Sequence, residues 1–181
     1  MQGKAIAWIG AVVGIISAIG VLYGIFHHPD TSVANYQKQI RPTCDRVHAT
    51  LTADHGLQIM KFNPNASFGD PQSEFLVDKA GLLQVARSNY ADIKSEFQVL
   101  QARLTPKALR SQKAKFDAAE RDWEAYEESS ILLIETKVRD GMTLGELNAI
   151  APDSTPETAR IRSEVNGALT ELAGGECTAL P

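Results

Sequence analysis

Charge is almost absent from the start of the chain, where Lys4 is the only charged side chain before residue 27. Residues 5–26 form an unbroken uncharged run, and as a helix they reach about 33 Å, which matches the hydrocarbon core of a bilayer. Trp8 and Tyr23 lie near the two ends of this run, where interfacial aromatic residues are usual. We therefore expect residues 1–30 to hold a single transmembrane anchor.

A cleaved signal peptide is the alternative to an anchor, because Ser32-Val33-Ala34 offers small residues for cleavage. The apolar run is longer than that of a typical signal peptide, and only Lys4 precedes it, so the anchor is favoured. Basic residues are scarce on both flanks, with Lys38 and Arg41 on the far side. The short N-terminal tail and the cysteine pair favour a cytoplasmic N-terminus, with residues 31–181 outside a bacterial plasma membrane.

Cysteine is scarce, since Cys44 and Cys177 are the only two. In an oxidising compartment an even pair indicates a disulfide, and two unrelated buried thiols are the alternative. A bridge closing a loop of about 133 residues would stabilise the fold by about 4–5 kcal/mol in the chain-entropy model.

A basic surplus is also missing, because the formal net charge is −4. Nucleic acid is therefore an unsuitable partner, and the sequence has no polybasic stretch to bind anionic lipid. Nucleophile elbows, phosphate loops, zinc-ligand spacings and paired Glu-x-x-His motifs are absent from the sequence as well. We expect a non-enzymatic protein with no cofactor and no evident small-molecule substrate.

The candidate metal ligands are few. Asp45, His48 and His55 fall on one stripe of the first expected helix, and carboxylates and imidazoles can ligate a metal. We interpret this stripe as a polar outer face and expect no metal site. The acidic run in the third expected helix is interpreted in the same way, as a solvated face: Glu120, Asp122, Glu124, Glu127 and Glu128.

Small residues gather on one face of the predicted anchor, including Gly10, Gly14, Ser17 and Gly24. Such a face lets another membrane helix approach closely. The expected partners are thus the membrane and either another membrane protein or a second copy of this chain. The alternative is that glycine is simply frequent in membrane helices.

Apolar residues recur at three- and four-residue spacing in the rest of the chain, and β-strand alternation is not evident. The predicted helices span residues 31–54, 71–104, 106–139 and 156–173. Pro42 predicts a kink in the first, and Gly81 leaves open a break that would make the start of the second a separate short helix. We expect an all-α fold, an up-down-up-down four-helix bundle carried on one transmembrane helix.

The second and third helices are expected to form an antiparallel hairpin centred between Leu104 and Thr105. This register places Tyr90 opposite Ala119 and Trp123 opposite Ala86, with Trp123 buried.

The features above favour a membrane-tethered, non-enzymatic helical interaction or scaffold domain on the outer face of the plasma membrane. A spanin-like or otherwise self-oligomerising envelope protein is the alternative. An enzyme with an unrecognised site is a third possibility, which a pocket with converging titratable groups would favour.

Overall fold

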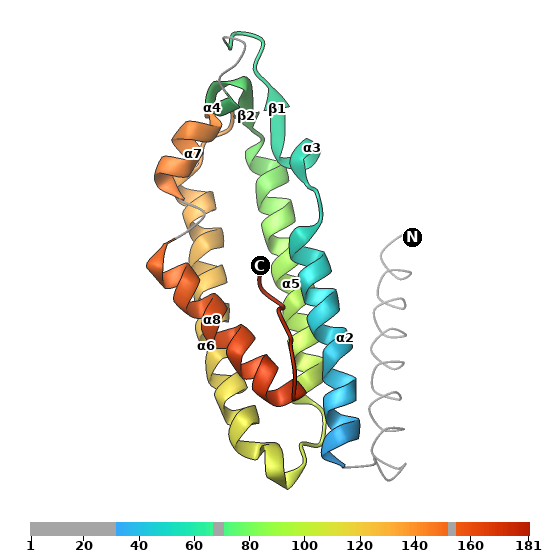
Figure 1. Cartoon of the computed structure of the whole chain (residues 1–181). Coiled ribbons are helices and arrows are strands. Elements are labelled where there is room, and N and C mark those ends of the chain that lie inside the picture. Colours follow the sequence, from blue (N-terminus) through green and yellow to red (C-terminus); the bar gives the residue numbers. More distant parts are fainter. Residues whose placement is uncertain (1–31, 67–70, 152–154) are drawn as a thin grey trace, which may run out of the picture.

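Four long helices dominate the computed structural model, which describes residues 32–66, 71–151 and 155–181. Successive long helices run in opposite directions along the molecule (Figure 1). They are α2 (Val33–Thr52), α5 (Lys79–Gln101), α6 (Arg110–Lys137) and α8 (Pro156–Ala173). The predicted helical bundle is confirmed.

The predicted anchor at residues 5–26, with its small-residue face at Gly10, Gly14, Ser17 and Gly24, lies outside the described residues. Within the part of the chain that the structure describes, no helix combines the length and apolar content needed to cross a membrane.

Helix ends follow local sequence signals. The Ser32 hydroxyl caps α2 by accepting a hydrogen bond from the Asn35 amide at 3.3 Å, and α2 continues through Pro42 without a break. Helix α8 occupies the predicted range, with Thr155 as its cap and Pro156 in its first turn. Gly174 ends it in the left-handed conformation, at φ 64°, where glycine has no Cβ to clash.

The main core lies where all four long helices meet. Phe97 of α5 contacts two rings of α6, with centroid distances of 5.3 Å to Phe116 and 5.2 Å to Trp123. Trp123 is only 2% exposed, as predicted. Fully buried residues from α2 and α8 complete this core: Ile40, Val47, Val165, Leu169 and Leu172.

The register of the α5–α6 hairpin differs from the prediction by roughly one helical turn. Trp123 packs against Tyr90, at a centroid distance of 5.6 Å, and against Phe97. The cause is the connection, which is longer than one residue. Helix α5 ends at Gln101, and the 3₁₀ turn η1 (Lys107–Leu109) precedes α6, so the centre of the turn moves toward the C-terminus.

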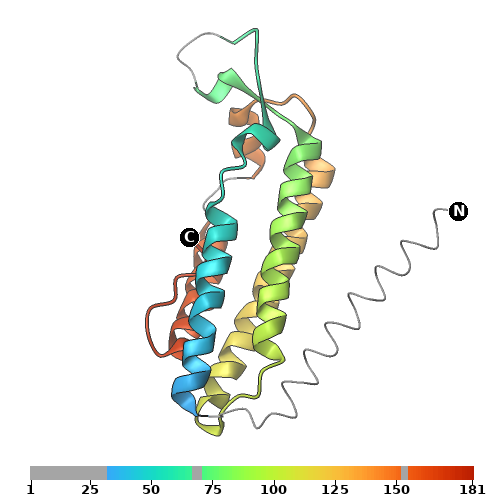
Figure 2. The same cartoon turned by 90° about the vertical axis from the view of Figure 1, so that its right-hand side faces the viewer.

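The end of the molecule opposite the start of α2 departs most from the predicted helices (Figure 2). The second predicted helix is wrong in its first part, where α4 (Pro71–Glu74) leads into β2 (Phe75–Val77). In the connection before it, α3 (Gly56–Ile59) leads into β1 (Met60–Phe62).

The two strands pair antiparallel, so the expectation of no strand is also wrong; three-residue strands are too short to show alternation. The break that Gly81 left open is real, because the Asp78 carboxylate caps α5 by accepting from the Gly81 amide at 3.1 Å. Helix α7 (Leu144–Ile150) begins with a capping box formed by Thr143 and Glu146. A small second core forms here from Val77, Val138 and Met142.

Candidate functional site

A groove of about 590 Å³ opens where α6 passes the end of α7 and the start of α8. It exists because α8 has 18 residues and α6 has 28, so α8 covers only part of α6. The described apolar residues lining it are Ala125, Leu133, Ile134, Ile150, Ala151 and Ile161. The described polar lining residues are Asp122, Tyr126, Ser129, Ser130, Thr155, Glu157 and Arg160.

The hydroxyl groups in the groove hold the start of α8 against α6. The Tyr126 hydroxyl lies 2.8 Å from the Thr158 hydroxyl, which lies 2.8 Å from that of Thr155. The Thr158 amide also donates to the Thr155 hydroxyl at 3.0 Å, as part of the helix cap. These groups therefore fix the shape of the groove.

Charge is confined to the rim. The Arg160 guanidinium donates to the Glu164 carboxylate at 2.7 Å and lies 3.7 Å from Asp122. The hydrogen bond to Glu164 raises the pKa of Arg160 above its usual value. With Asp122 and Glu157 also on the rim, the groove presents an apolar floor beside an acidic edge. None of the described lining residues is His, Cys or Lys.

Two carboxylates of α6 are not on the solvated face where the sequence led us to expect them. Glu120 is 2% exposed and accepts a hydrogen bond from the Gln101 side chain at 2.5 Å. Burial raises the pKa of Glu120, and the Gln101 hydrogen bond partly opposes this. Burial likewise raises the pKa of Glu127, which accepts a hydrogen bond from Trp123.

The spacing of these residues contained the missed signal. Glu120 and Glu127 alternate with Phe116 and Trp123 at intervals of four, three and four residues. This is the spacing of a single helical face, so the two carboxylates share the inner side of α6 with the aromatic residues.

The weak metal candidates are not gathered into a site. Asp45 and His48 are exposed on α2, whereas His55 lies beyond the end of that helix and precedes α3. Across residues 32–66, 71–151 and 155–181, no group of three or more His, Cys, Asp or Glu side chains is placed to hold a metal ion.

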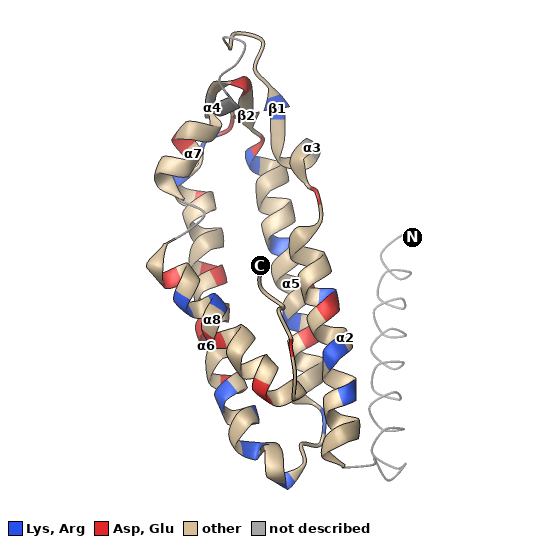
Figure 3. Ribbon diagram, viewed as in Figure 1, with Lys and Arg blue, Asp and Glu red and all other residues tan. Residues whose placement is uncertain are grey.

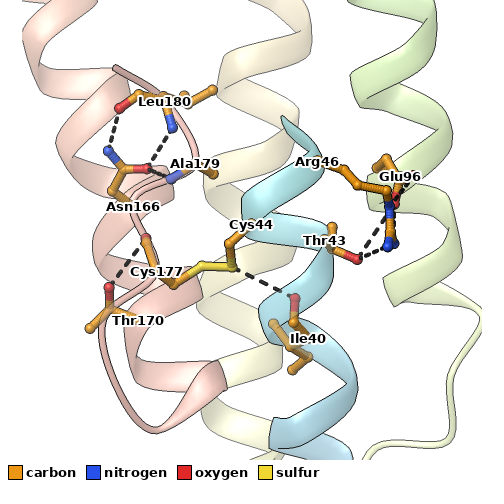
Figure 4. The surroundings of a disulfide bond; sticks show 10 residues. All are labelled: Ile40, Thr43, Cys44, Arg46, Glu96, Asn166, Thr170, Cys177, Ala179 and Leu180. Atoms are coloured by element: carbon orange, nitrogen blue, oxygen red, sulfur yellow. Dashed lines mark hydrogen bonds and ion pairs between the residues drawn. A yellow bond between two sulfur atoms is a disulfide. The ribbon is translucent and has the colours of Figure 1, made fainter. Parts of the chain in front are cut away.

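The predicted cysteine pair does come together. Cys44 of α2 and Cys177 of the tail after α8 form a disulfide with a Cα–Cα distance of 5.6 Å (Figure 4). Both are 3% exposed and belong to the main core.

Hydrogen bonds that the sequence did not reveal hold the tail in place. The Asn166 carbonyl oxygen accepts from the amides of Ala179 and Leu180, both at 2.9 Å, and its amide group donates to the Leu180 carbonyl at 2.7 Å (Figure 4). The Thr170 hydroxyl donates to the Cys177 carbonyl at 3.4 Å. An asparagine on a polar position of a helix gives no sign of such a role without the tail beside it.

No protein-family model matches this chain, and neither does any curated protein or solved structure. The disulfide and the groove are therefore the features from which its function is inferred.

Proposed function

We propose that this chain is a non-enzymatic interaction domain, tethered by residues 5–26 to the outer face of a bacterial plasma membrane. In this proposal it binds a partner protein through the groove between α6, α7 and α8. The observation that carries the proposal is the buried disulfide between Cys44 and Cys177.

The disulfide supports the location. Structural disulfides form and persist in oxidising compartments, and cytosolic thiols are kept reduced. This bond joins the first long helix to the tail that follows the last one, across a sequence separation of 133 residues. It therefore constrains almost the whole domain, which suits a protein exposed outside the cell.

The groove supports the binding role. Its volume of about 590 Å³ is within the usual range for ligand sites, and its apolar floor and charged rim are the usual composition. The rim carboxylates Asp122 and Glu157 favour a positively charged ligand. The expected occupant is a segment of another membrane protein in which an apolar side chain is flanked by Lys or Arg.

Site-specific photocrosslinking in intact cells tests this function. A photoreactive residue replacing Ser129, on the groove, should capture a single partner, and the same residue replacing the exposed Ser95 of α5 should not. The captured segment should contain apolar and basic residues. Equal capture from both positions, or none from Ser129 in cells that make the chain, would contradict the proposed use of the groove.

Self-association through the anchor is the second candidate, which the small-residue face of Gly10, Gly14, Ser17 and Gly24 favours. Replacing Gly10 or Gly14 with isoleucine adds bulk to that face without reducing its hydrophobicity. Association measured in a membrane assay should weaken while insertion is unchanged. Unchanged association in both variants would leave the groove as the only proposed contact.

A further inference from the structure

The end of the bundle where α2 begins is basic, although the formal net charge of the chain is −4. Residues 32–41 and 98–115 contain no Asp or Glu, and both segments lie at this end (Figure 3). Their basic residues are Lys38, Arg41, Arg103, Lys107, Arg110, Lys113 and Lys115. The fold brings together two groups of cations that are far apart in the chain, and we call them the basic end.

Direct contacts join the two segments. The Arg103 guanidinium donates to the Gln39 side chain, and the Tyr36 hydroxyl lies 3.4 Å from that of Thr105. Lys38 and Arg103 both line a hollow between α2 and the connection that follows α5. The two segments are therefore in direct contact at this end of the bundle.

Part of this positive charge is available to an external anion. Lys113 pairs with Asp117, and Lys115 pairs with Glu171 at 2.7 Å. Four exposed cations form no ion pair with any residue that the structure describes: Lys38, Arg41, Lys107 and Arg110.

The opposite end differs in its acidic residues. There, Lys61 pairs with Asp78 at 2.8 Å and Arg87 pairs with Glu135, whereas the exposed Lys137 and Arg139 form no ion pair with any described residue. The basic end is distinguished by the absence of Asp and Glu from residues 32–41 and 98–115.

An apolar side chain projects from the middle of the basic end. Leu104 is 62% exposed in the connection between α5 and α6, with Arg103 on one side and Lys107 close behind it in sequence. An exposed leucine beside cations is the composition of surfaces that bind at a membrane interface, where the apolar group enters the headgroup region and the cations contact phosphate.

The length of the chain before α2 fixes which end meets the membrane, if residues 5–26 are the anchor proposed above. Between Phe26 and Ser32 the chain spans at most about 20 Å even when fully extended. Helix α6, with 28 residues, is about 42 Å long. The basic end therefore stays within reach of the lipid headgroups.

We propose that the basic end docks on anionic phospholipid headgroups, with Leu104 at the interface. Docking would hold the long axis of the bundle upright on the membrane. The groove near the middle of α6 and the strands β1 and β2 at the far end would then lie away from the bilayer. This inference rests on the proposed membrane tether.

The test uses the full chain reconstituted into vesicles of zwitterionic lipid, with or without anionic phospholipid. An environment-sensitive probe is attached at Ala108→Cys, in the basic end, or at the control site Ala149→Cys, in α7; both alanines are exposed. A lipid-borne quencher should quench the Ala108 probe several-fold more in anionic than in neutral vesicles, and the Ala149 probe equally in both. High salt should remove the difference.

Charge variants separate docking from a general charge effect. The double variant Lys107→Gln with Arg110→Gln should lower the ratio of docked to undocked chains about 30-fold. Lys137→Gln with Arg139→Gln removes the same charge from the far end and should leave the ratio unchanged. Leu104→Ser should lower it as well.

The outcomes distinguish the inference from the tether. A chain that does not float with neutral vesicles lacks the anchor, which would overturn the proposed function. A chain that floats but shows equal quenching at both sites, or equal effects of both double variants, would overturn docking alone.

Discussion

Two regions of the molecule bury their apolar residues to different degrees: the half of the bundle around the disulfide, and the far end around the strands β1 and β2. In the disulfide half, four long helices and the tail after α8 share one core, in which Trp123, Phe97 and Leu169 are at most 2% exposed. At the far end lie two three-residue strands and the short helices α3, α4 and α7. Among the residues described there, the buried hydrophobic cluster consists of Val77, Val138 and Met142.

Exposure of aromatic residues shows the same contrast. Phe62 and Phe75 face each other across the two strands, yet they are 60% and 37% exposed. Stability should therefore be high in the disulfide half and lower at the far end, where local opening costs less free energy.

Removing the disulfide should have the largest effect on this contrast. Replacing Cys44 and Cys177 together with alanine should lower the free energy of unfolding by about 4–5 kcal/mol, because the unfolded chain regains the freedom of the closed loop. Urea unfolding of the full chain in detergent measures this loss. Hydrogen exchange at the far end should change little, and an equal loss of protection in both regions would show that the molecule has one cooperative unit.

The next largest effect is expected from the aromatic core. Trp123→Ala should cost roughly 3–5 kcal/mol, because it leaves a cavity among Phe97, Phe116 and Tyr90. Leu132 of the same helix is 57% exposed, so Leu132→Ala is the matched control and should change stability by about 0.5 kcal/mol or less. Similar losses in both variants would be inconsistent with this core.

A smaller and local effect is expected at Gly81, where α3 approaches the start of α5. A Cβ at this position would lie 1.7 Å from the Gln58 carbonyl oxygen, so Gly81→Ala forces the backbones apart. The expected cost is roughly 1–3 kcal/mol, with faster hydrogen exchange confined to the far end.

Gly167 of α8 has open space where a Cβ would be, so Gly167→Ala is the control and should stabilise by about 0.5–1 kcal/mol. No destabilisation by Gly81→Ala would contradict the close contact between Gly81 and Gln58. Destabilisation by Gly167→Ala would contradict the open space at Gly167.

The smallest effect concerns the buried Glu120. Because burial raises its pKa in the folded state, the folded state holds the proton more tightly than the unfolded state. This contribution favours folding at pH below the unfolded pKa and is lost as pH rises through the raised folded pKa. Between those two pKa values, the free energy of unfolding of Glu120→Gln should therefore depend less on pH than that of wild type. At neutral pH the variant should be more stable than wild type, by about 1 kcal/mol or less.

Unfolding followed from pH 4 to pH 7 in wild type and variant measures this difference. A variant that is less stable than wild type at pH 7, with an unchanged pH profile, would show that the carboxylate is needed in its ionised form.

Sequence patterns were sufficient where helices are long and end with local signals. Helix α8 occupies its predicted range of 156–173, with Thr155, Pro156 and Gly174 at its ends, and the disulfide followed from the cysteine pair. The hairpin register was not predicted, because it depends on how many residues the turn between α5 and α6 uses. The short strands gave no periodic signal, and the role of Asn166 depends on a tail that only tertiary structure places beside it.

The groove and the basic end were not foreseen for a similar reason. The groove results from the unequal lengths of α6 and α8, and its lining residues come from three helices. Five of the seven cations of the basic end lie in residues 103–115, a stretch without Asp or Glu, and the fold adds the cations of residues 32–41 to them. Both features belong to the arrangement of the helices.

The central claim, that the domain is displayed outside the cell with its disulfide formed, is tested most directly by thiol alkylation after rapid acid quenching of intact cells. The account predicts that Cys44 and Cys177 in the denatured chain react with the alkylating reagent only after a reductant is added. It also predicts that a membrane-impermeant protease removes residues 32–181 from intact cells, once any outer membrane has been opened. Free thiols on both cysteines, together with full protection of the domain from protease, would contradict it.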